Sequence, residues 1–200
     1  MLLLLDLSAA FDTIDHAILI TRLEQWVGFR GTALKWFASY LSNRTVAVAI
    51  NDHVSPSADL KYGVRQGSIL GPILFSLYML PLGVLIRRFN QVSYHCYADD
   101  TQLYFSFKMS NHSKLSILND CVLSIKDWMS QNFLQLNPDK TEILIIGPES
   151  IQTEIQHFMG TSTAKFTQTS KNLGVLFDQK LNFEPHVKKV VLFLSVKKHC

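Results

Sequence analysis

Four consecutive leucines, Leu2–Leu5, open the chain and are followed at once by the carboxylate of Asp6. An uninterrupted aliphatic run of this kind is typical of a strand that is buried on both faces of a sheet. Such a strand needs neighbouring strands and covering helices, which the rest of the chain must supply. Because a domain rarely begins in the middle of its core, the run also predicts that this sequence is a fragment of a larger domain.

Alternating apolar residues and turn signals predict the other strands. Two pairs are close enough in sequence to form hairpins, namely residues 45–50 with 54–62 and residues 92–97 with 101–107. Single strands are predicted over residues 141–146 and 173–177, and the stretch 149–170 is polar and weakly patterned.

Helical spacing of apolar residues predicts helices over about 15–27, 32–41 and 113–131, a long apolar helix after residue 68, and a basic helix at the end of the chain. Thr32 and Ser68 are expected to cap their helices, with Pro72 in the first turn of the apolar helix and Pro81 near a kink. Helices mixed with adjacent hairpins favour the α+β class, an antiparallel sheet backed by helices.

Composition and charge narrow the class of protein. A hydrophobic content of 48% excludes a disordered chain. The net charge is +3, but residues 179–200 carry +4, which leaves −1 on residues 1–178. Charge alone therefore does not indicate a nucleic-acid partner.

Targeting signals are weak. Three cysteines without a CxxC pair favour a reducing compartment over a disulfide framework or zinc site. The leucine run is too short for a secretion signal, and glycines and prolines interrupt the apolar stretch 69–86. The expected location is therefore intracellular, in the cytoplasm or nucleus, with no secretion and no membrane partner.

Three carboxylates occupy strand ends or turns. Asp6 ends the leucine strand, and Asp99 and Asp100 lie at the tip of an apolar hairpin. An Asp doublet alone is often a solvated turn. However, two neighbouring strands would bring Asp6 close to Asp99, and converging carboxylates suit Mg²⁺. Two such ions can support an in-line phosphoryl displacement, so a turn and a metal site both remain open.

Several motifs occur in a fixed order. They are Leu5-Asp6 to Asp15-His16, Gly63-Val64-Arg65-Gln66-Gly67-Ser68 to Gly71-Pro72, Tyr97-Ala98-Asp99-Asp100, Leu136-Asn137-Pro138-Asp139-Lys140-Thr141 and Leu173-Gly174-Val175. Together they resemble the palm motifs of reverse transcriptases of non-LTR (LINE-type) retrotransposons, from residue 2 to about 190. A lone Tyr-x-Asp-Asp is a weak signal, whereas the ordered set is specific. The resemblance implies a polymerase palm-type sheet.

The resemblance also implies the catalytic and metal-binding residues. Asp6, Asp99 and Asp100 would hold two Mg²⁺ ions, for which Mn²⁺ is a possible substitute, and Lys140 would protonate the departing pyrophosphate. Asp12 and Asp15 match the family without being metal ligands, and a role as helix caps accounts for them.

The substrate-binding residues implied by the resemblance surround these carboxylates. They are Phe11, Arg65, Gln66, Gly67, Tyr97 and Ala98. Phe11 would exclude a sugar that carries a 2′-hydroxyl, although a core packing role is the alternative. Arg65 would meet phosphate or remain solvated. The small Ala98 would leave room for the primer end, and Tyr97 would bind substrate or only pack.

Compared with complete enzymes of this family, the resemblance implies a chain in which the fingers are largely missing and the thumb is incomplete. Residues 1–178 are interpreted as a partial palm, and residues 179–200 as a basic helix that starts the thumb or connection. The expected function is RNA-directed DNA polymerase, acting on an RNA template, a DNA primer and dNTPs. The isolated chain is expected to be weak or inactive and to need the missing fingers and thumb or other retrotransposon segments. The alternative is a catalytically dead remnant that binds nucleic acid, whereas an unrelated phosphohydrolase would leave the motifs unexplained.

Overall fold

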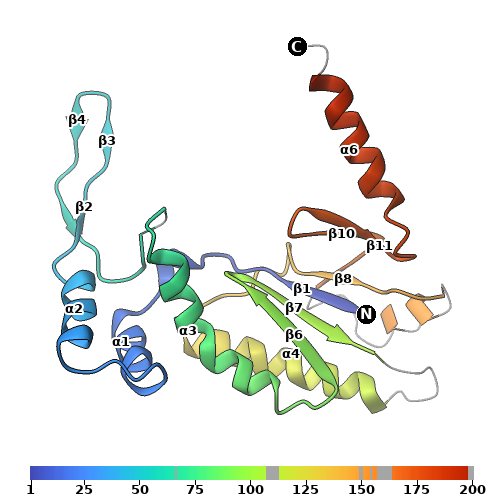
Figure 1. The fold of residues 1–200 in the computed structure, drawn as a ribbon, viewed down its shortest axis with the longest axis horizontal. Helices are drawn as coiled ribbons and strands as arrows, with labels where there is room; N and C mark the ends of the chain where they lie inside the picture. Colours follow the sequence, from blue (N-terminus) through green and yellow to red (C-terminus); the bar gives the residue numbers. More distant parts are fainter. Residues whose placement is uncertain (66, 107–112, 149–150, 154, 157–163, 198–200) are drawn as a thin grey trace.

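Five strands form the central sheet of the computed structural model, which describes residues 1–65, 67–106, 113–148, 151–153, 155–156 and 164–197 (Figure 1). In spatial order they are β6 (Val92–Tyr97), β7 (Asp100–Phe105), β1 (Leu2–Leu5), β8 (Glu142–Leu144) and β9 (Lys165–Thr167). Neighbours run antiparallel, except that β8 and β9 are parallel. The leucine strand β1 has a neighbouring strand on each side, but Leu4 is only half-buried, so the predicted burial on both faces is incomplete.

The two faces of this sheet differ in polarity because successive residues of a strand point to opposite sides. Leu3 pairs with Leu103 and Ile143, and all three side chains are buried in the hydrophobic core. Leu4, the next residue of β1, pairs instead with Gln102 and Glu142. The second face therefore presents polar side chains beside β1.

Helices α3 (Gly71–Ile86) and α4 (Ser113–Gln131) share the core with the apolar face. The predicted stripe of α4 is buried, since Leu115, Leu118, Val122, Ile125 and Met129 are each at most 2% exposed. Pro72 lies in the first turn of α3, and Pro81 lies inside the helix without ending it. The Ser68 hydroxyl accepts a hydrogen bond from the Gly71 N–H at 2.9 Å. Leu70 nevertheless occupies the N-cap position of α3, which has no side-chain cap, so the predicted cap at Ser68 is wrong.

Helices α1 (His16–Gln25) and α2 (Gly31–Leu41) follow a short 3₁₀ turn, η1 (Phe11–Thr13). Asp15 caps α1, and its carboxylate accepts a hydrogen bond from the Ile18 N–H at 2.8 Å. The predicted cap at Thr32 is wrong, because α2 already begins at Gly31 and Arg30 occupies the N-cap position.

The first predicted hairpin forms an arm that projects from the body beyond α2 (Figure 1). Its strands are β2 (Thr45–Val46), β3 (Ala49–Ile50), β4 (His53–Val54) and β5 (Ala58–Asp59), with β2 paired to β5 and β3 to β4. The ladder is interrupted where the Val48 N–H donates to the Ser55 hydroxyl at 3.0 Å. The arm therefore has shorter strands than the alternation predicted.

The last part of the chain forms a second hairpin and a helix, β10 (Thr169–Asn172), β11 (Val175–Asp178) and α6 (Glu184–Lys197). The predicted strand 173–177 starts too early, because Leu173 and Gly174 form the turn, with φ values of 45° and 88°. Strand β9 lies within the stretch for which no strand was predicted. Phe107, the predicted end of the central hairpin, lies outside the described residues.

The state of the cysteines and the apolar character of the helices, on which the predicted compartment depended, can be examined in the described part of the chain. Cys96 and Cys121 are free thiols there. In the same part of the chain, no helix combines the length and the apolar character that crossing a bilayer requires.

Candidate active site

Asp6 and Asp100 come from adjoining strands of the sheet. The last pair of the β1–β7 ladder joins Leu5 to Thr101, so the next positions, Asp6 and Asp100, lie opposite one another beyond it. By alternation both lie on the polar face. They line one small cavity of about 80 Å³.

The doublet is divided between a turn and a strand. Tyr97 pairs with Asp100, and Ala98 and Asp99 make the turn, with Ala98 at a φ of 52°. The sequence predicted both carboxylates at the hairpin tip and Asp99 close to Asp6. The structure places Asp100 in β7, opposite Asp6, with Asp99 beside it.

The three carboxylates influence one another electrostatically. Partial burial, followed by the negative charges of Asp99 and Asp6, raises the pKa of Asp100 above its ordinary value. Like charges placed together favour protonation, and a bound cation would relieve the same repulsion. The site therefore favours a positive charge.

Carboxylate oxygens are the donors that Mg²⁺ prefers. The donor chemistry of Asp6 and Asp100 fits such an ion, and both face the cavity. Within the described ranges, however, no three side chains of His, Cys, Asp or Glu are grouped closely enough to hold a metal. Asp99 belongs to the charge cluster without lining the cavity.

Lys140 lies beside this carboxylate pair. Its ammonium nitrogen is 3.9 Å from Oδ1 of Asp6, and it lines the same cavity. The loop that carries it is fixed to β1, because the Asn137 N–H donates to the Asp6 carbonyl at 2.8 Å and the Thr141 hydroxyl donates to the Asn137 carbonyl at 2.7 Å. A lysine far from Asp6 in sequence is thus held next to it.

Phe11 follows Asp6 by five residues and begins η1. Its half-buried ring packs on Phe75, with 4.9 Å between ring centroids. The Val64 N–H donates to the Phe11 carbonyl and the Gly63 N–H to the Ile14 carbonyl, each at 2.8 Å. The segment around residues 63–65 is therefore joined to the Phe11 turn.

The remaining predicted substrate residues occupy different surroundings. Arg65 is exposed and lines a separate cavity of about 300 Å³. Gly67 is exposed with a φ of 76°, Tyr97 is exposed, and Ala98 is half-buried. Gln66 lies outside the described residues.

Gly63 allows the close approach between this segment and the Phe11 turn. Its φ is 86°, and a Cβ there would lie 2.9 Å from the Asp12 carbonyl oxygen. Gly63→Ala is expected to lower the free energy of unfolding by about 2 kcal/mol through strain at positive φ and the backbone clash. Urea denaturation measures the change.

Gly28→Ala is the matched control, because Gly28 has the same φ of 86° and open space around it. It reports the backbone strain alone. If both variants lost equal stability, the contact with Asp12 would contribute nothing.

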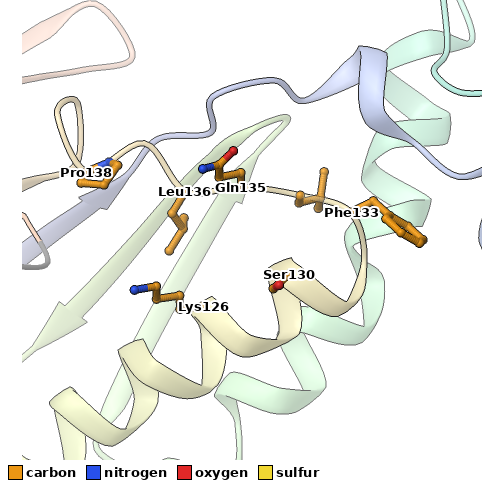
Figure 2. Close-up of a pocket in the computed structure, with 7 residues that line it drawn as sticks. Lys126, Ser130, Phe133, Gln135, Leu136 and Pro138 are labelled. Carbon is orange, nitrogen blue, oxygen red and sulfur yellow. The ribbon is translucent and has the colours of Figure 1, made fainter.

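A larger cavity of about 520 Å³ lies elsewhere, between α4 and the segment 133–138 (Figure 2). Lys126 and Leu136 extend into the gap between helix and segment. No described residue of the predicted site lines this cavity. Its size alone does not make it the active site.

Comparison with known proteins decides the family. The family described as "Reverse transcriptase (RNA-dependent DNA polymerase)" matches residues 1–180. The chain belongs to this reverse transcriptase family. The matched region includes β1, the β6–β7 hairpin and the Lys140 loop, so it holds every carboxylate of the site.

Three curated relatives of this reverse transcriptase chain come from Drosophila melanogaster. The "Probable RNA-directed DNA polymerase from transposon BS" is 26% identical over 193 residues, covering 92% of this chain and 20% of the relative. The "Probable RNA-directed DNA polymerase from transposon X-element" is 25% identical over 196 residues, which cover 98% of this chain and 21% of the relative. The "RNA-directed DNA polymerase from mobile element jockey" is 25% identical over 190 residues, which cover 93% of this chain and 20% of the relative. The chain thus spans about a fifth of the length of these relatives.

The candidate site also contains side chains that the sequence did not indicate. Gln102, Glu142, Lys171 and Asn172 line the same cavity as Asp6 and Asp100. The Gln102 amide donates to the Asn172 side-chain oxygen at 2.5 Å, and the Ser170 hydroxyl donates to Glu142. Alternation from Asp100 could have identified Gln102, whereas the docking of β10 onto the sheet has no local signal.

Proposed function

We propose that this chain carries the catalytic palm residues of an RNA-directed DNA polymerase, which adds dNTPs to a primer 3′-hydroxyl on an RNA template. The observation that carries the proposal is the placement of Asp6 opposite Asp100, around a cavity that Lys140 also lines. Residues 1–178 would form the palm portion, and residues 179–200 would form the start of the thumb or connection. An intracellular location stays a prediction.

The carboxylates of Asp6, Asp99 and Asp100 would hold two Mg²⁺ ions. When bound, these ions supply charge neutralisation of the triphosphate and activation of the primer hydroxyl. The raised pKa of Asp100 supports this assignment, because the negative charges of Asp99 and Asp6 add to the effect of partial burial.

The other residues bind and orient the substrates. Lys140, whose ammonium nitrogen lies 3.9 Å from Asp6, would donate a proton to the departing pyrophosphate. Arg65 would contact phosphate, while Gln66 and Gly67 would line the nucleotide pocket. Tyr97 and Ala98 precede the doublet and would contact the primer end.

Phe11 is proposed to exclude ribonucleotides by occupying the space of a 2′-hydroxyl. Phe11→Val is expected to raise ribonucleotide incorporation, relative to deoxynucleotide incorporation, by about 10- to 100-fold. The ratio of kcat/KM values for the two nucleotides measures it.

Phe75→Leu provides the control for Phe11, because it removes the ring that Phe11 packs on and keeps Phe11 itself. It is expected to lower stability without changing sugar selection. Equal selectivity changes in both variants would indicate that Phe11 only packs.

Primer extension tests the proposed polymerase. The chain would be joined to the segments that flank the matching region in the jockey polymerase, because this chain covers a fifth of that relative. Mg²⁺-dependent extension of a DNA primer on an RNA template supports the proposal. No extension with any flanking segments would overturn it.

A nucleic-acid-binding remnant without catalysis is the second candidate. The lack of a closed three-ligand cluster among the described side chains favours it. It predicts salt-dependent binding of a primer–template without Mg²⁺-dependent turnover. The polymerase and the nucleic-acid-binding remnant therefore predict different results in the primer-extension assay.

A further inference from the structure

The cavity of the candidate site is lined by side chains of both charges. The negative ones are the carboxylates of Asp6, Asp100 and Glu142, and the positive ones are the ammonium groups of Lys140 and Lys171. Among the described residues, only Lys140 forms an ion pair with a carboxylate of this cavity, at 3.9 Å from Oδ1 of Asp6. A cation of the chain itself thus lies beside a carboxylate that is proposed to bind metal.

An ammonium group and a divalent ion would compete for Asp6. Mg²⁺ binds carboxylate oxygens at about 2.1 Å and carries twice the charge of an ammonium group. Attraction between opposite charges grows with charge and falls with distance, so the carboxylate would hold the divalent ion more strongly than it holds Lys140. Two cations at one carboxylate also repel each other, and the ammonium is the one that is held more weakly.

Only the side chain of Lys140 has to move for this exchange. The loop backbone is anchored by Asn137, whose carbonyl accepts from the Thr141 N–H at 2.9 Å and whose side-chain oxygen accepts from the Asp139 N–H at 3.0 Å. The Lys140 side chain is 67% exposed, and an exposed ion pair of this kind contributes little to stability. The ammonium can therefore leave Asp6 by rotation about the side-chain bonds while the loop stays in place.

We propose that Lys140 competes with the divalent ion for Asp6: its ammonium group pairs with this carboxylate and is released when the ion binds. The role of the ion and the nature of the substrate rest on the proposed function, whereas the competition itself requires no turnover. Because its loop is anchored, the released ammonium stays at the site and becomes available to the departing pyrophosphate. Metal binding thereby controls the placement of the proposed proton donor.

Mn²⁺ titration of the whole chain, followed by electron paramagnetic resonance, tests the competition without turnover. Lys140→Gln is expected to bind Mn²⁺ about threefold more tightly, because an exposed ion pair no longer has to break. The same variant, fused to the flanking segments of the jockey polymerase, should extend primers more slowly because the proton donor is lost. A lysine that only shaped the site would lower both quantities. Lys140→Arg keeps the positive charge and should bind Mn²⁺ like the native chain.

Two matched controls remove the same charge from other lysines. Lys165→Gln deletes an ammonium that pairs with Asp139 at 3.2 Å and does not line the cavity. Lys171→Gln deletes the second ammonium of the cavity, for which the described part of the chain shows no ion pair with Asp6. Each control should raise Mn²⁺ affinity less than Lys140→Gln does. Equal increases in all three variants would mean that net charge, and not competition at Asp6, sets the affinity. Circular dichroism confirms that each variant is folded.

The release of Lys140 can also be observed directly. Reductive methylation with ¹³C-formaldehyde labels the lysines and keeps their charge. The ¹³C signal of Lys140, identified by its loss in Lys140→Arg, should shift when Mg²⁺ is added, whereas the signal of Lys165 should not. A Lys140 signal that stays unchanged at saturating Mg²⁺ would show that the ammonium does not leave Asp6.

Metal binding and primer extension can fail separately. If the native chain binds Mn²⁺ and Lys140→Gln binds it no more tightly than Lys171→Gln, the competition is wrong and the proposed polymerase is unaffected. If Mn²⁺ binding follows the expectations but no fused chain extends a primer, the proposed function is wrong and the competition at Asp6 stands. If neither the native chain nor Lys140→Gln binds Mn²⁺, the competition and the proposed metal site are both wrong.

Discussion

Asp6→Asn is expected to abolish divalent-cation binding by the chain and to lower primer extension about a thousandfold, which corresponds to about 4 kcal/mol. The amide keeps the shape of the side chain but removes half of the facing carboxylate pair with Asp100. Mn²⁺ titration followed by electron paramagnetic resonance reports the free ion and so measures binding without turnover. Extension in the fused polymerase measures the catalytic loss.

The variant should remain folded, because the carboxylate cluster does not stabilise the chain when it is ionised. The raised pKa of Asp100 means that the folded state binds its proton more tightly than the unfolded state does. The resulting stabilisation is present below the ordinary carboxyl pKa and is lost as pH rises through the folded value. At neutral pH, removing one charge therefore leaves the melting temperature unchanged or higher.

Asp127→Asn is the control for Asp6, because it removes an exposed carboxylate on α4, an element that packs against the other face of the sheet. It should bind Mn²⁺ like the native chain. If Asp6→Asn also bound Mn²⁺ normally, Asp6 would not be a ligand, and the polymerase proposal would lose its main support.

Local sequence patterns predicted most of the helices and strands, because these elements depend on interactions between residues that are close in sequence. The leucine run identified an inner strand, and the spacing from Leu115 to Met129 identified a fully packed helix face. Asp15 was recognised as a cap because a cap depends on residues only three positions apart. These features need no information about distant segments.

Register and docking could not be predicted in the same way. The sequence predicted that Asp99 lies close to Asp6 but gave no register. In the structure the β1–β7 ladder leads to Asp100 opposite Asp6, because Ala98 and Asp99 form the hairpin turn. The parallel pairing of β9 with β8 depends on a connection that has no local pattern. Choosing between such pairings requires the packing of the whole sheet.

Arg22 is the clearest case of a role hidden from the sequence, because an arginine on an amphipathic helix is ordinarily solvated. In the structure it is 6% exposed. Its guanidinium donates to the Tyr78 carbonyl and to the Asn132 side-chain oxygen, and it lies 4.2 Å from the Tyr78 ring centroid and 5.2 Å from that of Trp128. It thereby joins α1 to α3 and to the end of α4.

The acceptors of Arg22 are a carbonyl and an amide rather than a carboxylate, and burial lowers the pKa of the guanidinium from its ordinary value. Arg22→Ala is expected to lower the free energy of unfolding by about 3–5 kcal/mol. The loss combines a cavity, two unpaired buried acceptors and the lost ring contacts. Urea denaturation of the whole chain measures it, with exposed Lys35→Ala as a control that should stay within about 0.5 kcal/mol.

Two further variants separate the contributions to this loss. Arg22→Met keeps an apolar stem and leaves both acceptors unpaired, so it should lose about 2 kcal/mol. Arg22→Lys keeps the charge but has no planar guanidinium to reach Tyr78 and Asn132 together. Its free energy of unfolding should therefore also be lower than that of the native chain. If Arg22→Met were as stable as the native chain, packing of the stem alone would hold α1 against α3, and the buried hydrogen bonds would add nothing to that junction.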